Sequence, residues 1–194
     1  MDKLADNDSF AKLNQQISTR IYHRFLQGKV INKLSYQLQK SAFVEDKDYV
    51  YLFRYQSQFE LLYALIGKTL VYHAKGEFYY IDNNADTDLE EADEHALKTQ
   101  SILLVIARHF EMSGRGMHQL SDEHTGLHLQ DTLELDKHDE YKAICKALKF
   151  KNWLKATEYL VNRGFAFETS PESFVLSSAG TAFCHALLDA YDKR

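Results

Sequence analysis

Thr69-Leu-Val-Tyr-His-Ala-Lys-Gly-Glu-Phe-Tyr-Tyr-Ile81 is the stretch that decides the fold. Aromatic and β-branched residues fill both arms, and Lys75-Gly76 stands between them. Such residues favour strands, and a glycine between two such arms favours a turn, so the stretch predicts a β-hairpin. Side chains alternate along a strand, so Phe78 and Tyr80 would face one way and Tyr79 the other.

The residues before this hairpin have helical spacing. One apolar set recurs every three or four residues up to a stop near Gly28, and it consists of Phe10, Leu13, Ile17, Ile21 and Phe25. The apolar spacing of residues 53–66 predicts another helix, which would end at Gly67. Residues 33–43 are expected to form a short helix between the two, and residues 46–48 a turn. Helix, short helix, helix and hairpin is the order of a winged helix.

The second half repeats this order. Residues 82–94 are expected to be an acidic linker that runs into an apolar helix over residues 102–110. Two further helices follow, one marked by Tyr141, Ile144, Cys145 and Leu148 and one over residues 152–162. A second hairpin would turn at residues 170–173, and Phe183, Leu187 and Tyr191 mark a closing helix. Residues 112–136 are expected to form a loop with one short helix.

These patterns predict a mainly α fold with small β-hairpins, of the α+β class, built from tandem winged-helix domains. The N-terminal domain would span residues 1–86 and the C-terminal domain residues 87–194.

Composition limits the partners. The net charge is −5 and the pI about 6.0, whereas a dedicated nucleic-acid binder is usually strongly basic. We expect no membrane span and no export signal, because no apolar run approaches about 20 residues. Cys145 and Cys184 are then expected to be free buried thiols of a cytoplasmic protein.

The sequence gives little support for a metal, a cofactor or catalysis. His118, His124, His128 and His138 are close in sequence, but their order is not that of a zinc peptidase, and we expect loop histidines. In the calcium-like segment 82–93, Thr87 stands where glycine is needed, so an acidic linker is expected. Nucleophile and phosphate-loop motifs are absent from the sequence. We therefore predict no enzyme and no cofactor.

Basic residues gather in the second half and could contact DNA phosphates weakly. Lys142, Lys146 and Lys149 are expected to share one helical face; the alternative is a solvated amphipathic surface. The predicted DNA-binding residues are Lys142, Lys146, Lys149, Lys151, Lys155 and Arg163.

Aromatic residues crowd the first half beyond what so small a core would need. Tyrosine is favoured at protein interfaces. The alternative is a tyrosine-rich sheet face that the chain's own helices cover. The predicted interface residues are Tyr55, Phe59, Tyr63, Tyr72, Phe78, Tyr79 and Tyr80.

Three stretches, 25–31, 55–65 and 70–81, resemble the N-terminal winged helix of the MukE and MksE proteins. The acidic segment and the apolar helix over residues 99–110 resemble the start of that family's second domain. The resemblance implies a non-enzymatic homodimer that binds a MukF-like or MksF-like kleisin. It would work with an SMC-type ATPase in the cytoplasm and nucleoid, in chromosome condensation and partition or in plasmid defence. A winged-helix transcription regulator remains the alternative, and an unrecognised enzyme is a weaker third reading.

Overall fold

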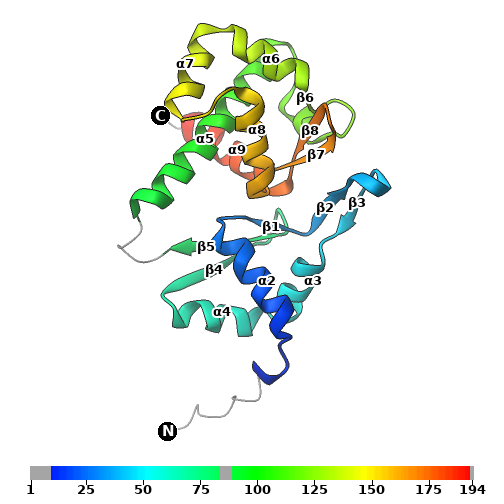
Figure 1. Cartoon of the computed structure of the whole chain (residues 1–194), viewed down its shortest axis with the longest axis vertical. Helices are drawn as coiled ribbons and strands as arrows, with labels where there is room; N and C mark the ends of the chain where they lie inside the picture. The colour runs from blue at the N-terminus through cyan, green and yellow to red at the C-terminus, as the bar shows by residue number, and fades with distance from the viewer. Residues whose placement is uncertain (1–9, 84–88, 193–194) are drawn as a thin grey trace.

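The computed structural model describes residues 10–83 and 89–192, and it contains two lobes (Figure 1). We call residues 10–83 the N-lobe and residues 89–192 the C-lobe. Both combine helices with small antiparallel sheets, so the predicted α+β class is confirmed. The predicted domain boundary, between residues 86 and 87, and part of the predicted linker lie outside the described residues.

The N-lobe begins with a helix and ends with a hairpin. Its elements in chain order are α2 (Gln15–Leu26), β1 (Ile31–Asn32), β2 (Leu34–Gln37), η1 (Leu38–Lys40), β3 (Ala42–Glu45), α3 (Lys47–Arg54), α4 (Gln56–Leu65), β4 (Lys68–His73) and β5 (Phe78–Asn83). The side chain of Asn14 accepts a hydrogen bond from the backbone N–H of Ile17, which fixes the start of α2. The predicted hairpin is confirmed as β4–β5, with Val71 opposite Tyr80.

The helix predicted over residues 33–43 is wrong. These residues belong to the hairpin β2–β3, in which Tyr36 pairs with Phe43. The two rings meet edge to face, with centroids 5.1 Å apart, and such cross-strand aromatic pairs stabilise a sheet. Ser41 takes the left-handed conformation that the turn requires, with φ 47°. The hairpin is inserted between β1 and α3.

The helix predicted over residues 53–66 is two helices, because the chain breaks between α3 and α4 at Tyr55. Asp46, expected in a turn, instead caps α3, and its carboxylate accepts the backbone N–H of Asp48 at 2.7 Å. Gly67 follows α4 with φ +72°, as expected for a helix stop.

The C-lobe starts with a long helix and closes with another. Its elements in chain order are α5 (Leu89–Met112), η2 (Met117–Ser121), β6 (Leu127–His128), α6 (Leu129–Lys137), α7 (Asp139–Ala147), α8 (Trp153–Arg163), β7 (Ala166–Ser170), β8 (Ser173–Leu176) and α9 (Ser178–Asp192). The predicted helices and the hairpin β7–β8 are confirmed, although the side chain of Tyr191 lies outside the described residues. The loop predicted over residues 112–136 also contains strand β6, which the sequence analysis missed.

The two lobes share one topology. The three-stranded sheets have the orders β1-β5-β4 and β6-β8-β7, so in each lobe the last strand lies in the middle. A helix precedes the first strand of each sheet, and further helices lie between that strand and the hairpin (Figure 1). The N-lobe core includes Ile21, Leu52 and Phe59, and the C-lobe core includes Ile106 and Trp153.

Strand β5 belongs to both cores. Tyr79 packs in the N-lobe core, whereas Phe78 is fully buried in the C-lobe core. Phe78 and Tyr80 both approach Phe183 of α9, with ring centroids 6.4 Å apart in each case. The predicted alternation of these side chains is therefore confirmed, and the face that bears Phe78 and Tyr80 packs on the chain's own C-lobe.

Candidate functional site

The seam between the lobes is held by backbone and side-chain hydrogen bonds. The backbone N–H of Val30 donates to the carbonyl oxygen of Arg163 at 2.9 Å. The buried Asn32 donates to the carbonyl oxygen of Gly164, and its side-chain oxygen accepts from Ser178 and Ala179 at 3.2 Å each. These bonds fix β1 to the end of α8 and to the start of α9.

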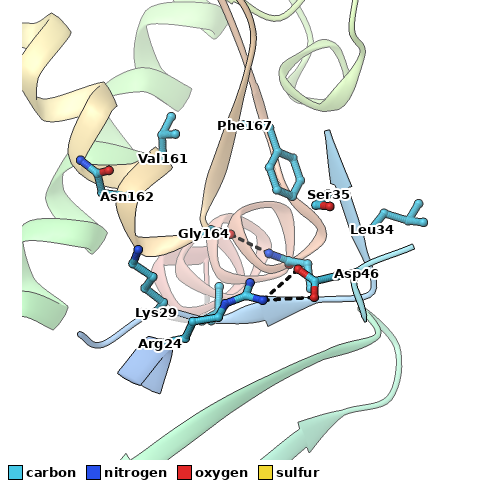
Figure 2. A pocket seen from close by; sticks show the side chains of 11 residues that line it. Arg24, Lys29, Leu34, Ser35, Asp46, Val161, Asn162, Gly164 and Phe167 are labelled. Atoms are coloured by element: carbon cyan, nitrogen blue, oxygen red, sulfur yellow. Dashed lines mark hydrogen bonds and ion pairs between the residues drawn. The ribbon is translucent and has the colours of Figure 1, made fainter. Parts of the chain in front are cut away.

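A cavity of about 200 Å³ lies at this seam. Figure 2 shows Arg24 facing Asp46, with Phe167 near Ser35 on the other side. Arg24 bonds both Asp46 and Asp48 at 2.9 Å, so its charge is balanced within the chain. Lys29 lies beside the last turn of α8, where the helix dipole favours a cation. The guanidinium of Arg24 is therefore committed to the chain's own carboxylates.

Four of the seven aromatic residues predicted to form an interface are buried within the chain. Phe59, Tyr63 and Tyr79 lie in the N-lobe core and Phe78 in the C-lobe core, so these four rings are not on the surface. Tyr55, Tyr72 and Tyr80 are half-buried. The aromatic side chains of the first half therefore fill the two cores and the contact between the lobes. Composition alone does not reveal this burial.

The tyrosine hydroxyls in the N-lobe are partly engaged. Tyr79 donates to Gln56 at 2.9 Å, and the Tyr49 and Tyr72 hydroxyls lie 3.2 Å apart. Burial raises the pKa of Tyr79 to about 12 and raises the pKa of Tyr63 further. Among the described residues, no group forms a hydrogen bond with the buried Tyr63 hydroxyl. These phenols stay protonated and act as packing groups.

The exposed apolar surface of the N-lobe lies instead on α4. Leu61, Leu65 and Ile66 are 51%, 72% and 52% exposed, and Ala64 between them is also exposed. Leu61 and Leu65 are one turn apart, so they form one stripe. We call these four residues the α4 face. The sequence pattern does not reveal this face, because residues 61–66 are apolar almost throughout and their spacing does not show which side of the helix is covered.

The basic residues predicted to contact DNA do not form one helical face. Lys142 and Lys146 are exposed one turn apart on α7, but α7 ends at Ala147, and Lys149 follows in a left-handed conformation with φ 66°. The prediction that Lys149 shares their face is therefore wrong. The turn after Leu148 redirects the chain, and no glycine marks it.

Several of these cations are already paired. The Lys149 ammonium lies 3.0 Å from Glu94, and hydrogen bonds from Lys98 and Lys149 lower the pKa of Glu94 to about 2. Lys155 pairs with Glu158 at 2.6 Å. Arg163 lies over the ring of Tyr159, 5.1 Å from its centre. Within the part of the chain that the structure describes, Lys142, Lys146 and Lys151 form no ion pair.

The histidines do not assemble a metal site. His124 is on an exposed loop, whereas His128 precedes α6 and contacts Ser173 at 3.0 Å. Over residues 10–83 and 89–192, no group of three or more His, Cys, Asp or Glu side chains could hold a metal ion. Cys145 and Cys184 are free and buried as predicted, and burial raises the pKa of each thiol to about 11.

Another charged cluster organises the C-lobe. The Asp131 carboxylate accepts hydrogen bonds from Arg115 and from the backbone N–H of His128, and it lies 3.4 Å from His109. Burial alone would raise the pKa of Asp131, but these hydrogen bonds outweigh burial and hold it well below its usual value. The cluster joins α5, β6 and α6 through hydrogen bonds within the chain, so we assign it a structural role.

Comparison with known proteins identifies the family. No helix among the described residues has the length and apolarity needed to cross a membrane. The family model for the condensin complex protein MksE matches residues 16–188, and no curated protein matches the chain. The resemblance seen in the sequence is thereby confirmed, and MksE is a non-catalytic, structural subunit. The chain belongs to the MksE family of condensin complex proteins.

Proposed function

We propose that this chain is the adaptor subunit of an SMC–kleisin complex of the MukBEF or MksBEF type. It binds a MukF-like or MksF-like kleisin, pairs with a second copy of itself, and works with the SMC-type ATPase. Each lobe serves as a winged-helix unit, with domains at residues 1–86 and 87–194. The repeated sheet order, with the last strand in the middle, supports that reading.

The α4 face is the observation that carries this proposal. Helix α4 takes the third-helix position of the N-lobe, the position that reads DNA in winged helices. A helix that contacts DNA needs Arg or Lys for phosphates and polar side chains for base edges. Helix α4 contains no Lys or Arg, and its exposed side offers Leu61 and Leu65. Such a surface suits a protein partner, and its apolar stripe can pair with its own copy because an isologous contact needs no opposite charge.

Co-expression tests the proposal. The full-length chain, tagged, is purified together with the kleisin and the SMC ATPase from its own cell, and its mass is measured by light scattering. We expect a homodimer that retains the kleisin. Leu61→Lys with Leu65→Lys should give a monomer. The matched control, Lys142→Glu with Lys146→Glu on α7, also places two charge changes one turn apart and should stay dimeric. A wild-type chain that does not retain the kleisin would refute the proposal.

The second candidate function is weak DNA contact through the C-lobe, within the same complex or in a transcription regulator. Helix α8 is the last helix before the hairpin of that lobe, the place that α4 takes in the N-lobe, and Lys151 and Lys155 are exposed on it or just before it. Glu158 neutralises part of this charge. Phosphate contacts weaken steeply with salt, so retention of duplex DNA from 50 to 200 mM salt measures their number. A transcription regulator would also prefer one operator sequence, which the adaptor would not.

The role in the cell is chromosome organisation and segregation, in the cytoplasm and nucleoid, or defence against plasmids. Deletion of the gene distinguishes the two. Loss of the chromosome role gives cells without DNA, whereas loss of the defence role leaves chromosomes normal and raises plasmid retention.

A further inference from the structure

A groove of about 680 Å³ runs between the lobes along α9. One wall is α9, and the other consists of the inserted hairpin β2–β3 and the turn between β4 and β5. Leu34 and Phe43 of the hairpin line the groove and remain 46% and 37% exposed. The volume lies in the range of binding sites rather than of packing defects. We call this space the α9 groove.

The α9 wall includes a row of small side chains, with Thr181 and His185 beside it. Ser178, Ala182 and Ala186 line the groove at intervals of four residues, so they lie on one line of the helix. Small side chains on such a line let a second helix come within about 8 Å of the axis. The span from Ser178 to Asp189 is about 17 Å, or roughly three helical turns.

The opposite wall combines apolar side chains of the hairpin with charged side chains of the β4–β5 turn. Phe43 meets Phe167 of β7 edge to face, with ring centroids 5.8 Å apart, and Leu176 also lines the groove. A helix satisfies its own backbone hydrogen bonds and presents only side chains, so its apolar face can pack on Phe43, Phe167 and the small residues of α9.

Opposite charges mark the two ends. Ser178 bonds Asn32, and the neighbouring Lys33 pairs with Glu77 at 2.7 Å, which places the β4–β5 turn and Lys75 at the start of α9. Asp189 lies about three turns further along α9. Among the described residues neither Lys75 nor Asp189 has an ion-pair partner, and both line the groove. The occupant would carry an acidic residue at one end and a basic residue at the other.

We propose that the α9 groove holds one amphipathic α-helix of the kleisin, about three turns long, with small or apolar residues towards α9 and Phe43. This inference rests on the proposed function, because it takes the kleisin as the partner. The α4 face remains free for the second copy.

Tiled peptides test the inference. Peptides of about 20 residues that cover the MukF-like or MksF-like kleisin of the same cell are titrated with the full-length chain by fluorescence polarisation. We expect one peptide to bind and to gain helicity on binding. Ala186→Trp, which fills the groove from an exposed position, should weaken binding at least tenfold. The matched control is Ala143→Trp at an exposed position of α7, which should bind as the wild type does.

A charge swap tests which end of the bound kleisin helix lies beside Lys75. Lys75→Glu should weaken binding about fivefold, and exchanging one acidic residue of the peptide for Lys should restore it. Wild-type affinity in both Ala186→Trp and Lys75→Glu would overturn the inference, and so would a bound peptide without helicity. If the wild-type chain retains full-length kleisin but binds none of the peptides, the groove is not the site, while the adaptor role stands. If it retains no kleisin at all, the proposed function itself fails.

Discussion

The side-chain amide of Asn32 donates a 2.8 Å hydrogen bond to the carbonyl oxygen of Gly164, which lies 132 residues further along the chain. The same carbonyl accepts from Ser177 at 2.7 Å, and the oxygen of Asn32 accepts from the start of α9. Asn32 therefore joins the first strand of the N-lobe to the helix ends that frame the seam. These bonds tie the two lobes together at the seam.

Replacing Asn32 by Ala should lower the free energy of unfolding by about 2 to 3 kcal/mol, because buried donors and acceptors lose their partners. Ser178 and Ala179 would lose their acceptor, while Gly164 would keep the bond from Ser177. Urea titration followed by circular dichroism measures the change. Ser35→Ala is the control and should change little, because among the described residues the Ser35 side chain at the same seam forms no hydrogen bond to the other lobe. Equal stability of Asn32→Ala and wild type would show that the contact is not stabilising.

Gly164 should tolerate no side chain, for two separate reasons. Its φ of +81° is strained for other residues, and an added Cβ would lie 2.7 Å from the carbonyl oxygen of Val30. Gly67 has φ +72° but open space around it, so Gly67→Ala isolates the backbone strain at about 1 kcal/mol. We expect Gly164→Ala to cost clearly more than Gly67→Ala in the same urea titration. Similar losses of stability in the two variants would mean that the backbone at the seam shifts to accommodate the added methyl group.

Local pattern predicted most of the elements, because capping groups and apolar spacing act within a few residues. Prediction from local pattern failed where one pattern fits both a helix and a strand. Leu34 and Leu38 are four residues apart, which suggests a helix, while Leu34-Ser-Tyr-Gln also alternates apolar and polar residues as a strand does. The hairpin wins because Tyr36 meets Phe43 across it and Phe43 meets Phe167 of the other lobe. The second contact depends on tertiary structure and leaves no local signal.

The candidate sites were harder to predict than the fold. Phe78 and Tyr79 are neighbours in sequence, yet they enter different cores, because the β4–β5 sheet packs on helices on both faces. Aromatic content alone cannot distinguish a ring buried between the lobes from a ring that is exposed and binds another protein. Likewise, Lys149 and Glu94 are 55 residues apart, so their ion pair cannot be inferred from the lysine spacing.

Asp131 should make the C-lobe acid-sensitive. Its pKa in the folded chain lies below the value of about 3.9 in an unfolded chain, so the unfolded state binds the proton more readily. The stabilisation is therefore present in full above about pH 5 and is lost as the pH falls below 4. Asp131→Asn should be about 2 to 3 kcal/mol less stable than the wild type at pH 7, and this gap should shrink towards pH 2. Urea titrations at both pH values measure it; a gap that is constant with pH would contradict the assignment.

DNA contact by the C-lobe should depend on the unpaired lysines. Lys142→Glu, Lys146→Glu and Lys151→Glu together remove three cations that form no ion pair among the described residues, so DNA retention at 50 mM salt should fall several-fold while folding is unchanged. Lys149→Glu alone should act less, because Glu94 already neutralises Lys149. Filter binding of a labelled duplex measures both. Unchanged retention in the triple variant would show a solvated surface with no role in DNA binding.

The contact of Phe78 with the C-lobe should make the two lobes unfold together. Trp153 is the single tryptophan, it is buried in the C-lobe, and its indole N–H donates to the carbonyl oxygen of Tyr141 at 3.1 Å, so its fluorescence reports on that lobe. In the wild type, the fluorescence and circular dichroism transitions in urea should coincide.

Phe78→Ala removes a ring of the N-lobe from the C-lobe core and should cost about 3 to 5 kcal/mol. Because that ring links the cores, the two transitions should also separate in the variant. The control is Leu120→Ala, a buried change confined to the C-lobe, which should destabilise the chain but leave the unfolding of the two lobes coupled. Separate fluorescence and circular dichroism transitions in the wild type would show that the lobes unfold independently.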